Sequence, residues 1–217
     1  MKRNSIVLGT ILAVVVVFAA GLFAYQNKKG QVRTEAAVQG VRSLVQFHSP
    51  SLGPSDAKVT LVEFFDPSCE ACRAFHPYVK SILAENPTKV RLVLRYAAFH
   101  KDSDVVVKIL EAAKVQSLFW QSLEAVLQSQ PIWAEHGNPQ IQRVWEFLKP
   151  VGLDAEKAKR DMESPRIAAI LKQDMADVAT LKVDKTPTFF VNGKPLLESN
   201  PNALRALVQQ EIKTSYP

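Results

Sequence analysis

The sequence predicts an α/β domain that is interrupted by a block of helices. Residues 59–65 form a mostly apolar, partly β-branched run, residues 90–96 form a second one, and a helical stretch lies between them. A strand, a helix and a strand in this order favour a right-handed parallel β-α-β unit. Helical patterns then fill residues 102–181, and residues 189–191 return as a short strand. The expected fold class is therefore α/β with a helical insertion.

The first 25 residues have the composition of a membrane anchor. Lys2 and Arg3 precede an almost unbroken apolar run over residues 6–25. That run is long enough to span a bilayer, whereas the apolar core of a cleavable signal peptide has about 7–15 residues. We expect an uncleaved signal anchor, a transmembrane helix, in residues 1–25. Small residues at positions 19–21 keep cleavage as an alternative, and in both cases the bulk of the chain leaves the cytoplasm.

The domain is expected to begin after a tether. Residues 26–43 are polar and contain two glycines, which is typical of a linker, although a weak apolar face leaves an oligomerising stalk as an alternative. Residues 44–217 then form the domain. We expect a first strand over residues 44–47, followed by a loop rich in turn residues over residues 49–56.

The remaining elements follow from apolar spacing and from turn residues. The run at residues 59–65 is typical of a buried central strand, and the helix after it should end near residue 85, before Asn86-Pro87. Apolar residues at spacings of three and four predict helices through residues 102–181. Asn192-Gly193 predicts a type I′ hairpin, after which residues 194–197 pair back and a closing helix runs over residues 201–213.

The charge of the chain does not point to nucleic acid. Its 27 basic and 21 acidic residues give a net charge of +6, and Lys2, Arg3, Lys28 and Lys29 supply four of these charges near the N-terminus. The sequence has no basic stripe interleaved with aromatic residues. We therefore expect no nucleic-acid partner.

The chain has two cysteines, which stand together as Cys69-Glu70-Ala71-Cys72 at the expected start of a helix. A helix N-terminus offers unsatisfied backbone N–H groups and the positive end of the helix dipole, and both favour a thiolate. The second thiol can resolve a mixed disulfide formed at the first. Zinc needs about four ligands, and of the four scattered histidines only His76 falls on a neighbouring turn. We predict a redox pair and no resident metal, with a copper(I) site on two thiolates as the alternative.

Two motifs in combination carry a resemblance to a known family. Residues 62–66 (VEFFD) lead into the C-x-x-C motif, and residues 186–193 (TPTFFVNG) follow more than a hundred positions later. Residues 118–120 (LFW) and 152–154 (GLD) open two of the helices between them. From about residue 52 to the C-terminus, the chain resembles the DsbA-like branch of the thioredoxin superfamily. The resemblance implies a thioredoxin-like fold with a helical domain inserted before the cis-proline strand, and thiol–disulfide exchange as the activity.

The resemblance also implies roles for individual residues. It makes Cys69 the exposed nucleophile and Cys72 the buried resolving thiol, which together form a redox-active Cys69–Cys72 disulfide. It makes the Thr186–Pro187 bond cis and packs these two residues against the sulfurs. There, a backbone edge can pair with an extended substrate strand. An ordinary trans proline before a strand is the alternative at Pro187.

Glu63 stands in the apolar strand six residues before Cys69, where the superfamily often has a buried acid. Burial raises the pKa of a carboxyl group, which would suit Glu63 to exchange the proton of Cys72. We therefore name Glu63 as a catalytic residue, with a partly solvated glutamate as the alternative. At His100, which follows the second strand, we expect a surface histidine rather than a residue of the active-site rim.

Glu70 and Thr186 depart from the strongly oxidising members of the family. Those members carry a histidine between the two cysteines, whereas a carboxylate at Glu70 would oppose the Cys69 thiolate and make the disulfide less oxidising. If Glu70 points into water, screening makes it unimportant. The strongly oxidising members of the family have a valine at the position that corresponds to Thr186, whereas threonine is common in reductases and isomerases. The direction of electron flow stays open.

The sequence thus predicts an extracytoplasmic thiol–disulfide oxidoreductase, in the first instance an oxidase, that acts on cysteine-containing protein substrates. It needs no cofactor, because the dithiol itself carries two electrons. We expect a membrane protein that resets the cysteine pair, and a single-pass location in the bacterial inner membrane with the catalytic domain facing the periplasm. The alternatives are a reductase or an isomerase, a copper-binding chaperone, and a non-enzymatic assembly factor. An oligomer formed through residues 26–43 would favour the isomerase.

Overall fold

The computed structural model describes Gly21, residues 44–135 and residues 138–217. In these residues the sheet has five strands in the spatial order β1-β3-β2-β4-β5. β2 and β3 are parallel, whereas β1, β4 and β5 pair antiparallel with their neighbours. The strands are β1 Ser51–Leu52, β2 Val59–Phe65, β3 Val90–Tyr96, β4 Thr188–Val191 and β5 Lys194–Pro195.

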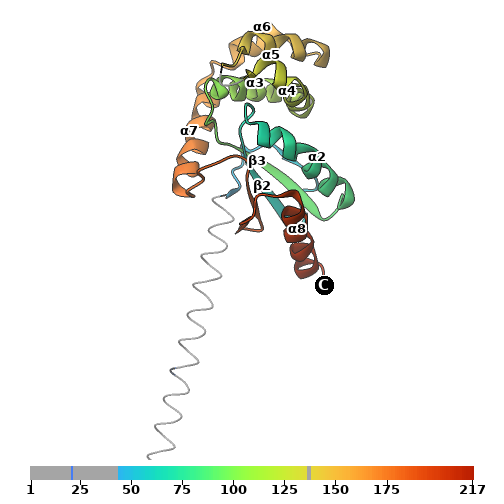
Figure 1. Cartoon of the computed structure of the whole chain (residues 1–217). Helices are drawn as coiled ribbons and strands as arrows, with labels where there is room; N and C mark the ends of the chain where they lie inside the picture. Colours follow the sequence, from blue (N-terminus) through green and yellow to red (C-terminus); the bar gives the residue numbers. More distant parts are fainter. Residues whose placement is uncertain (1–20, 22–43, 136–137) are drawn as a thin grey trace, which may run out of the picture. The chain divides into compact units, whose positions relative to one another are not determined.

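Helices cover the sheet and form a block beyond one end of it (Figure 1). The predicted helical insertion is confirmed: in the described part of the chain, five α-helices, α3 to α7, lie between β3 and β4. A 3-10 turn, Lys149–Val151, follows α5. The helices are α2 Glu70–Glu85, α3 Ser103–Val115, α4 Phe119–Trp133, α5 Ile141–Leu148, α6 Ala155–Asp161, α7 Pro165–Thr180 and α8 Pro201–Ser215.

β2 is the central strand, and all seven of its residues are buried. Because side chains alternate along a strand, its two faces enter different apolar clusters. Leu61 and Phe65 pack in the cluster that includes residues of α2 and α8, whereas Val62 and Phe64 pack in the cluster that includes Val178 of α7. Burial on both faces explains why this strand is a nearly continuous apolar run. The β-α-β unit predicted from residues 59–96 is confirmed.

The hairpin between β4 and β5 has the backbone that its sequence predicts. Asn192 has a φ of 49° and Gly193 a φ of 81°, so both central residues adopt the positive φ that a type I′ turn requires. The Asn192 side chain also accepts a hydrogen bond from the Thr60 backbone N–H at 2.9 Å. This contact joins the turn to β2.

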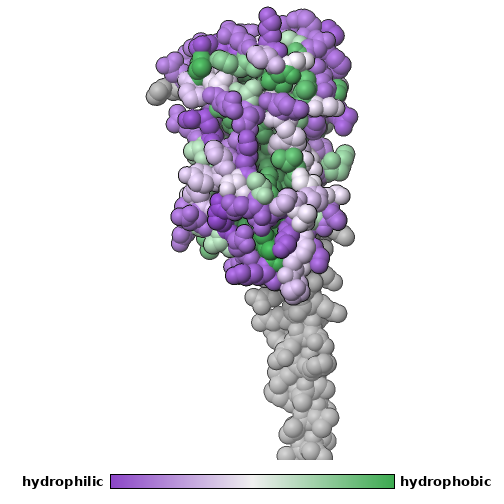
Figure 2. Space-filling view, turned by 90° about the vertical axis from the view of Figure 1, so that its right-hand side faces the viewer, coloured by the Kyte–Doolittle hydropathy of each residue, from purple (hydrophilic) through white to green (hydrophobic). Residues whose placement is uncertain are grey.

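The molecular surface is largely polar on the face shown in Figure 2, where apolar side chains gather in a band along the middle. Within residues 44–135 and 138–217, no helix has both the length and the apolar character needed to cross a membrane. The signal anchor predicted in residues 1–25 and the linker predicted in residues 26–43 lie outside the described residues, apart from Gly21.

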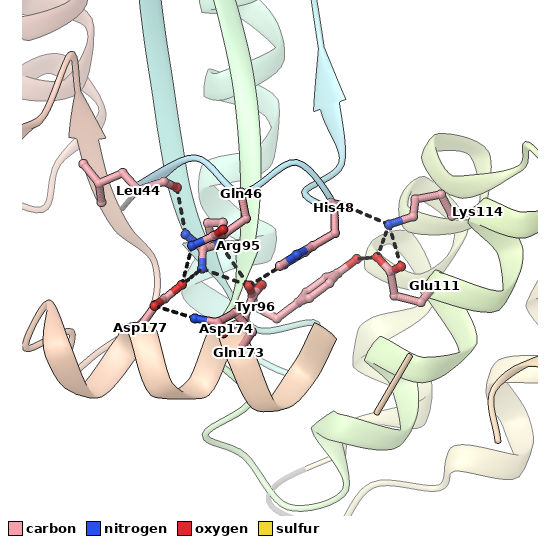
Figure 3. Close-up of polar contacts among 10 residues, drawn as sticks. All are labelled: Leu44, Gln46, His48, Arg95, Tyr96, Glu111, Lys114, Gln173, Asp174 and Asp177. Carbon is pink, nitrogen blue, oxygen red and sulfur yellow. Dashed lines mark hydrogen bonds and ion pairs between the residues drawn. The ribbon is translucent and has the colours of Figure 1, made fainter. Parts of the chain in front are cut away.

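A buried ion pair joins the sheet to α7 (Figure 3). Arg95 of β3 is fully buried and donates to Asp174 Oδ1, from Nε at 3.0 Å and from Nη2 at 2.9 Å. Nη2 also lies 2.5 Å from Oδ2 of Asp177, and Nη1 donates to the Leu44 carbonyl at 2.8 Å. A buried charge is tolerated only when it is paired and hydrogen-bonded, and this set of contacts satisfies that condition.

The prediction of a strand over residues 44–47 is wrong. The edge strand that pairs with β3 is instead β1, Ser51–Leu52. Residues 44–48 are used for contacts with the buried ion pair: Gln46 donates to Asp177 at 3.0 Å, and His48 Nε2 lies 2.8 Å from Asp174 Oδ1. Figure 3 shows these side chains converging with Arg95 on α7. Such distant polar partners are not visible in a local apolar pattern.

Replacing Asp174 by alanine should destabilise the domain by about 3–5 kcal/mol, because it removes a buried carboxylate that balances the charge of Arg95. The measurement is urea unfolding of the full chain, followed by circular dichroism. Glu156→Ala, which removes the partner of Lys159 in an exposed pair, is the matched control and should change the stability much less. Equal effects of the two variants would contradict the importance of the buried pair.

Candidate active site

The two cysteines lie at the junction of β2 and α2. β2 ends at Phe65, and the turn that follows brings Cys69 to the N-cap position of α2, with φ −77° and ψ 118°. Both cysteines are free thiols in the structure, and the exposed fractions are 6% for Cys69 and 0% for Cys72. Sγ of Cys69 lies 3.2 Å from the carbonyl oxygen of Thr186, so a residue 117 positions away meets the first sulfur.

The two thiols have opposite acidities. A hydrogen bond from the Cys72 thiol, assisted by the side chain of Thr186 and by the backbone N–H groups of Ala71 and Cys72, lowers the pKa of Cys69 to about 5, against the effect of burial. Burial, with contributions from Cys69 and Glu63, raises the pKa of Cys72 far above its usual range. At neutral pH the first sulfur is therefore a thiolate and the second a thiol. This is the division of roles that nucleophile and resolving thiol require.

Glu63 lies in β2, close enough to Cys69 and Cys72 for their charges to interact. It is 3% exposed, and strand alternation places it on the same face as Leu61 and Phe65, which face α2. Burial, and secondly the charge of Cys69, raises the pKa of Glu63 to about 8. The glutamate is thus buried rather than solvated, and it is mostly protonated at neutral pH. A neutral carboxyl group that is sensitive to the charge of the cysteines can give or take a proton there.

The Thr186–Pro187 peptide bond is cis, and Pro187 is buried. These two residues directly precede β4, in which Thr188 pairs with Phe64 of β2. That register brings the loop to the end of β2 where the cysteine turn begins. The sheet thus brings the predicted residues of the site together from its two distant sequence regions.

Gln130 of α4 holds the cysteine turn, a role that was not predicted from the sequence. Its side chain is 1% exposed and donates from Nε2 to the carbonyl oxygens of Pro67 at 2.7 Å and Cys69 at 3.0 Å. Its own carbonyl accepts from Arg73 Nε at 2.9 Å. A signal was available, because Gln130 falls in helical phase with Leu123 and Leu127 and is therefore a polar residue on an apolar face. The helical block is in this way hydrogen-bonded to the carbonyl of Cys69.

Asp66 anchors both segments that leave this end of the parallel strands. It is fully buried, and its Oδ1 accepts from the Ser68 backbone N–H at 2.8 Å and from the Ser103 hydroxyl. Its Oδ2 accepts from the backbone N–H groups of Phe99 at 2.8 Å and His100 at 3.0 Å, and it also lies 2.8 Å from Nδ1 of the His100 ring. The turn after β2 and the loop after β3 are thereby fixed to one carboxylate.

A pocket of about 410 Å³ opens beside Cys69. His100, for which a surface position away from the rim was expected, belongs to this pocket together with its neighbour Lys101. Within residues 44–135 and 138–217, no group of three or more His, Cys, Asp or Glu side chains is arranged to hold a metal ion. The lining residues are Ser68, Cys69, Glu70, Ala71, His100, Lys101, Ala134 and Pro139.

Comparisons with known proteins identify relatives of this chain. The profile of a family described as thioredoxin matches residues 47–210. A Na(+)/H(+) antiporter NhaA of Herminiimonas arsenicoxydans is 30% identical over 145 residues, which are 66% of this chain; the chain spans only about a fifth (22%) of that protein's length. A Bacillus cereus protein named probable disulfide bond formation protein D is 28% identical, over 98% of this chain and 100% of its own length.

A solved structure agrees with the fold. The crystal structure of a thioredoxin-like oxidoreductase from Silicibacter pomeroyi is 28% identical, and the match covers 79% of this chain and 95% of the other. Its TM-score of 0.67 shows that the two chains share the arrangement of strands and helices described above.

Replacing Gln130 by methionine should lower the unfolding free energy of the reduced protein by about 1–3 kcal/mol, because two buried carbonyls lose their donor. Gln128→Met on the same helix is the matched control: Gln128 is exposed and donates to Glu124. Urea unfolding of the full chain under reducing conditions measures both variants. If Gln130→Met were as stable as the control, the claim that the hydrogen bonds of Gln130 stabilise the cysteine turn would be refuted.

Replacing Glu63 by glutamine should change how stability depends on pH. The pKa of Glu63 is raised from 4.5 to about 8 in the folded protein, so its favourable contribution is fully present below pH 4.5 and is lost as the pH rises towards 8. In that window the wild type should lose about 1.4 kcal/mol per pH unit relative to Glu63→Gln.

The measurement is urea unfolding of both reduced proteins at intervals between pH 4.5 and pH 8. Glu70→Gln, an exposed neighbour of the site, is the control and should follow the wild type. If the unfolding free energies of the wild type and Glu63→Gln changed in parallel with pH, the raised pKa of Glu63 would be refuted.

Proposed function

Because the chain belongs to the thioredoxin family, as a thiol–disulfide oxidoreductase of the DsbA-like type, we propose that it oxidises cysteine pairs of protein substrates outside the cytoplasm. The observation that carries the proposal is the unequal acidity of the two thiols. The pKa of Cys69 is lowered to about 5 by donated hydrogen bonds, and burial keeps Cys72 protonated. A stabilised Cys69 thiolate stabilises the reduced protein, and this makes the disulfide a better oxidant.

The reaction is a two-step exchange. A substrate thiolate attacks Sγ of Cys69 in the Cys69–Cys72 disulfide, the S–S bond between the cysteines breaks, and its electron pair goes to Cys72. The substrate is then held as a mixed disulfide on Cys69. The second substrate thiol, once ionised, attacks the substrate sulfur, and Cys69 leaves as a thiolate. Two electrons pass from the substrate to the protein, and the substrate acquires a disulfide.

Glu63 serves the proton transfer at the buried sulfur. When Cys72 receives the electron pair, burial makes its thiolate unfavourable, so it takes up a proton. The Glu63 carboxyl is protonated at neutral pH and lies on the α2 face of β2. It donates the proton to Cys72, and it takes the proton back when the disulfide is restored.

Thr186 and Pro187 present the substrate. Their loop runs beside the cysteine turn, with the Thr186 carbonyl 3.2 Å from Cys69 Sγ. An extended substrate segment can pair with a backbone edge of this kind, so that affinity comes from main-chain hydrogen bonds and tolerates many sequences. This fits an enzyme whose substrates are cysteine-containing proteins of different kinds.

A reductase is the second candidate, and Thr186 favours it. Glu70 weighs less against an oxidase than its position in the motif suggests, since its side chain is exposed and the Cys69 pKa is lowered with Glu70 in place. A pKa of about 5 lies between the values of about 7 for thioredoxin and about 3.5 for DsbA. We therefore keep the oxidase as the first assignment.

The proposed location depends on the apolar run at residues 6–25. We propose a single-pass anchor in the bacterial inner membrane, with the catalytic domain on the periplasmic side. An oxidase that has accepted two electrons must pass them on, and a membrane protein beside the anchor is the proposed partner that restores the disulfide. The relative in Bacillus cereus, which matches along its whole length, carries a name that refers to disulfide bond formation and supports this direction.

The reduction potential of the Cys69–Cys72 pair tests the proposal. Equilibration of the full-length protein with glutathione buffers should give a value between about −270 mV and about −120 mV, the thioredoxin and DsbA limits. The oxidised protein should also introduce disulfides into a reduced model substrate, and Cys69→Ser should abolish this activity. A potential at or below that of thioredoxin would overturn the oxidase assignment in favour of a reductase.

A further inference from the structure

His100 shares a pocket with the nucleophilic sulfur, although it comes from a different part of the sheet. The loop after β3 carries it, whereas Cys69 begins the helix after β2. Its side chain is 49% exposed, and both residues line the same pocket of about 410 Å³. A cysteine of a substrate that approaches Cys69 through this pocket therefore passes the imidazole.

The ring of His100 has a defined tautomer when it is neutral. Its Nδ1 lies 2.8 Å from Oδ2 of Asp66. The other groups around the Asp66 carboxylate are donors, namely three backbone N–H groups and the Ser103 hydroxyl, so the carboxylate acts as their common acceptor. The proton of the neutral imidazole is therefore on Nδ1, and Nε2 carries a free lone pair.

The loop does not depend on this contact alone. The backbone N–H groups of Phe99 and His100 already bind Asp66. The contrast with His48 is informative, because that ring also contacts an aspartate but is only 8% exposed within the buried network of Arg95. A half-exposed imidazole that is oriented by a buried carboxylate has the geometry of a general base.

We propose that His100 is a catalytic acid–base residue for the substrate cysteine, with Asp66 as its positioning residue. The inference rests on the exchange activity proposed above. In the forward step, the substrate thiol gives its proton to Nε2 of His100 while its sulfur attacks Cys69 Sγ. The S–S bond to Cys72 breaks, and the electron pair goes to Cys72. In the reverse step, the imidazolium returns the proton to the substrate sulfur as it leaves.

The charges around His100 are compatible with this role. Asp66 contacts the ring at Nδ1, while Glu70 and Lys101 line the pocket with opposite charges. Cys69 contributes a negative charge only in the reduced protein, in which it is a free thiolate. In the oxidised protein, which accepts the substrate thiol, its sulfur is part of the neutral disulfide. No base at that sulfur then competes with His100 for the proton of the substrate thiol.

The test compares two small thiols as reductants of the oxidised full-length protein. Glutathione is mostly protonated at neutral pH, whereas a more acidic alkyl thiol such as trifluoroethanethiol is ionised to a much larger extent and still reduces protein disulfides. A thiol with a pKa near 8.5 is only a few per cent ionised at pH 7, so a general base can gain at most about thirtyfold. His100→Gln, whose amide can still donate to Asp66, should slow reduction by glutathione about tenfold at pH 7 and slow reduction by the more acidic thiol much less.

Two measurements separate catalysis from a structural effect. The loss with glutathione should disappear in the alkaline range, where this thiol ionises unaided, and the ultraviolet absorbance of the Cys69 thiolate should titrate as in the wild type. His76→Gln is the control, because His76 also contacts a carboxylate, Glu124, but is not part of the pocket.

The outcomes are distinct. Equal losses with both thiols, or no loss with either, would overturn the role of His100 while exchange itself stands. If the wild type reacted with neither thiol, the proposed exchange activity would fail, and the inference would fail with it.

Discussion

The site depends on one buried carboxylate. Asp66 follows the central strand, is inaccessible to solvent, and accepts hydrogen bonds from the turn that leads to Cys69 and from the loop that carries His100. Buried backbone N–H groups need acceptors, and a single side chain supplies them for two segments that leave neighbouring parallel strands. Gln130 holds the same turn from the helical block. The sulfur of Cys69 is thus positioned from the sheet and from the insertion together.

The electrostatics of the site allow one negative charge among three acidic groups. Donated hydrogen bonds stabilise the thiolate of Cys69, whereas burial keeps Cys72 and Glu63 protonated at neutral pH. The effects of Cys69 and Glu63 on stability have opposite signs. A lowered pKa of Cys69 makes the reduced fold more stable as the pH rises from about 5 to 9.0, and a raised pKa of Glu63 makes it less stable from 4.5 to about 8. These windows overlap, so the two contributions largely offset each other in the reduced protein.

Local patterns in the sequence predicted the elements that depend on local interactions. The central strand, the helix after the cysteines and the type I′ turn at Asn192 are each specified by apolar spacing, a helix start or a positive φ. What the sequence could not show is pairing at a distance. Gln130 reaches a carbonyl 61 positions away, and Arg95 reaches Asp174 across 79 positions. The failure over residues 44–47 has the same origin, because that segment is used by the Arg95 network rather than by the sheet.

The direction of electron flow is a property of these buried interactions more than of the dipeptide between the cysteines. A residue in that dipeptide is exposed, as Glu70 is, and solvent and salt screen its effect on the sulfur. The hydrogen bonds that stabilise the Cys69 thiolate come instead from Cys72, from the side chain of Thr186 and from the start of α2, where burial makes each of them stronger. The histidine that strong oxidases carry inside the motif is therefore not required for a stabilised thiolate. In this chain the histidine that lines the pocket of Cys69 is His100, from the loop after β3. Its proposed role is to take the proton of the substrate thiol, whereas the buried donors set the reduction potential.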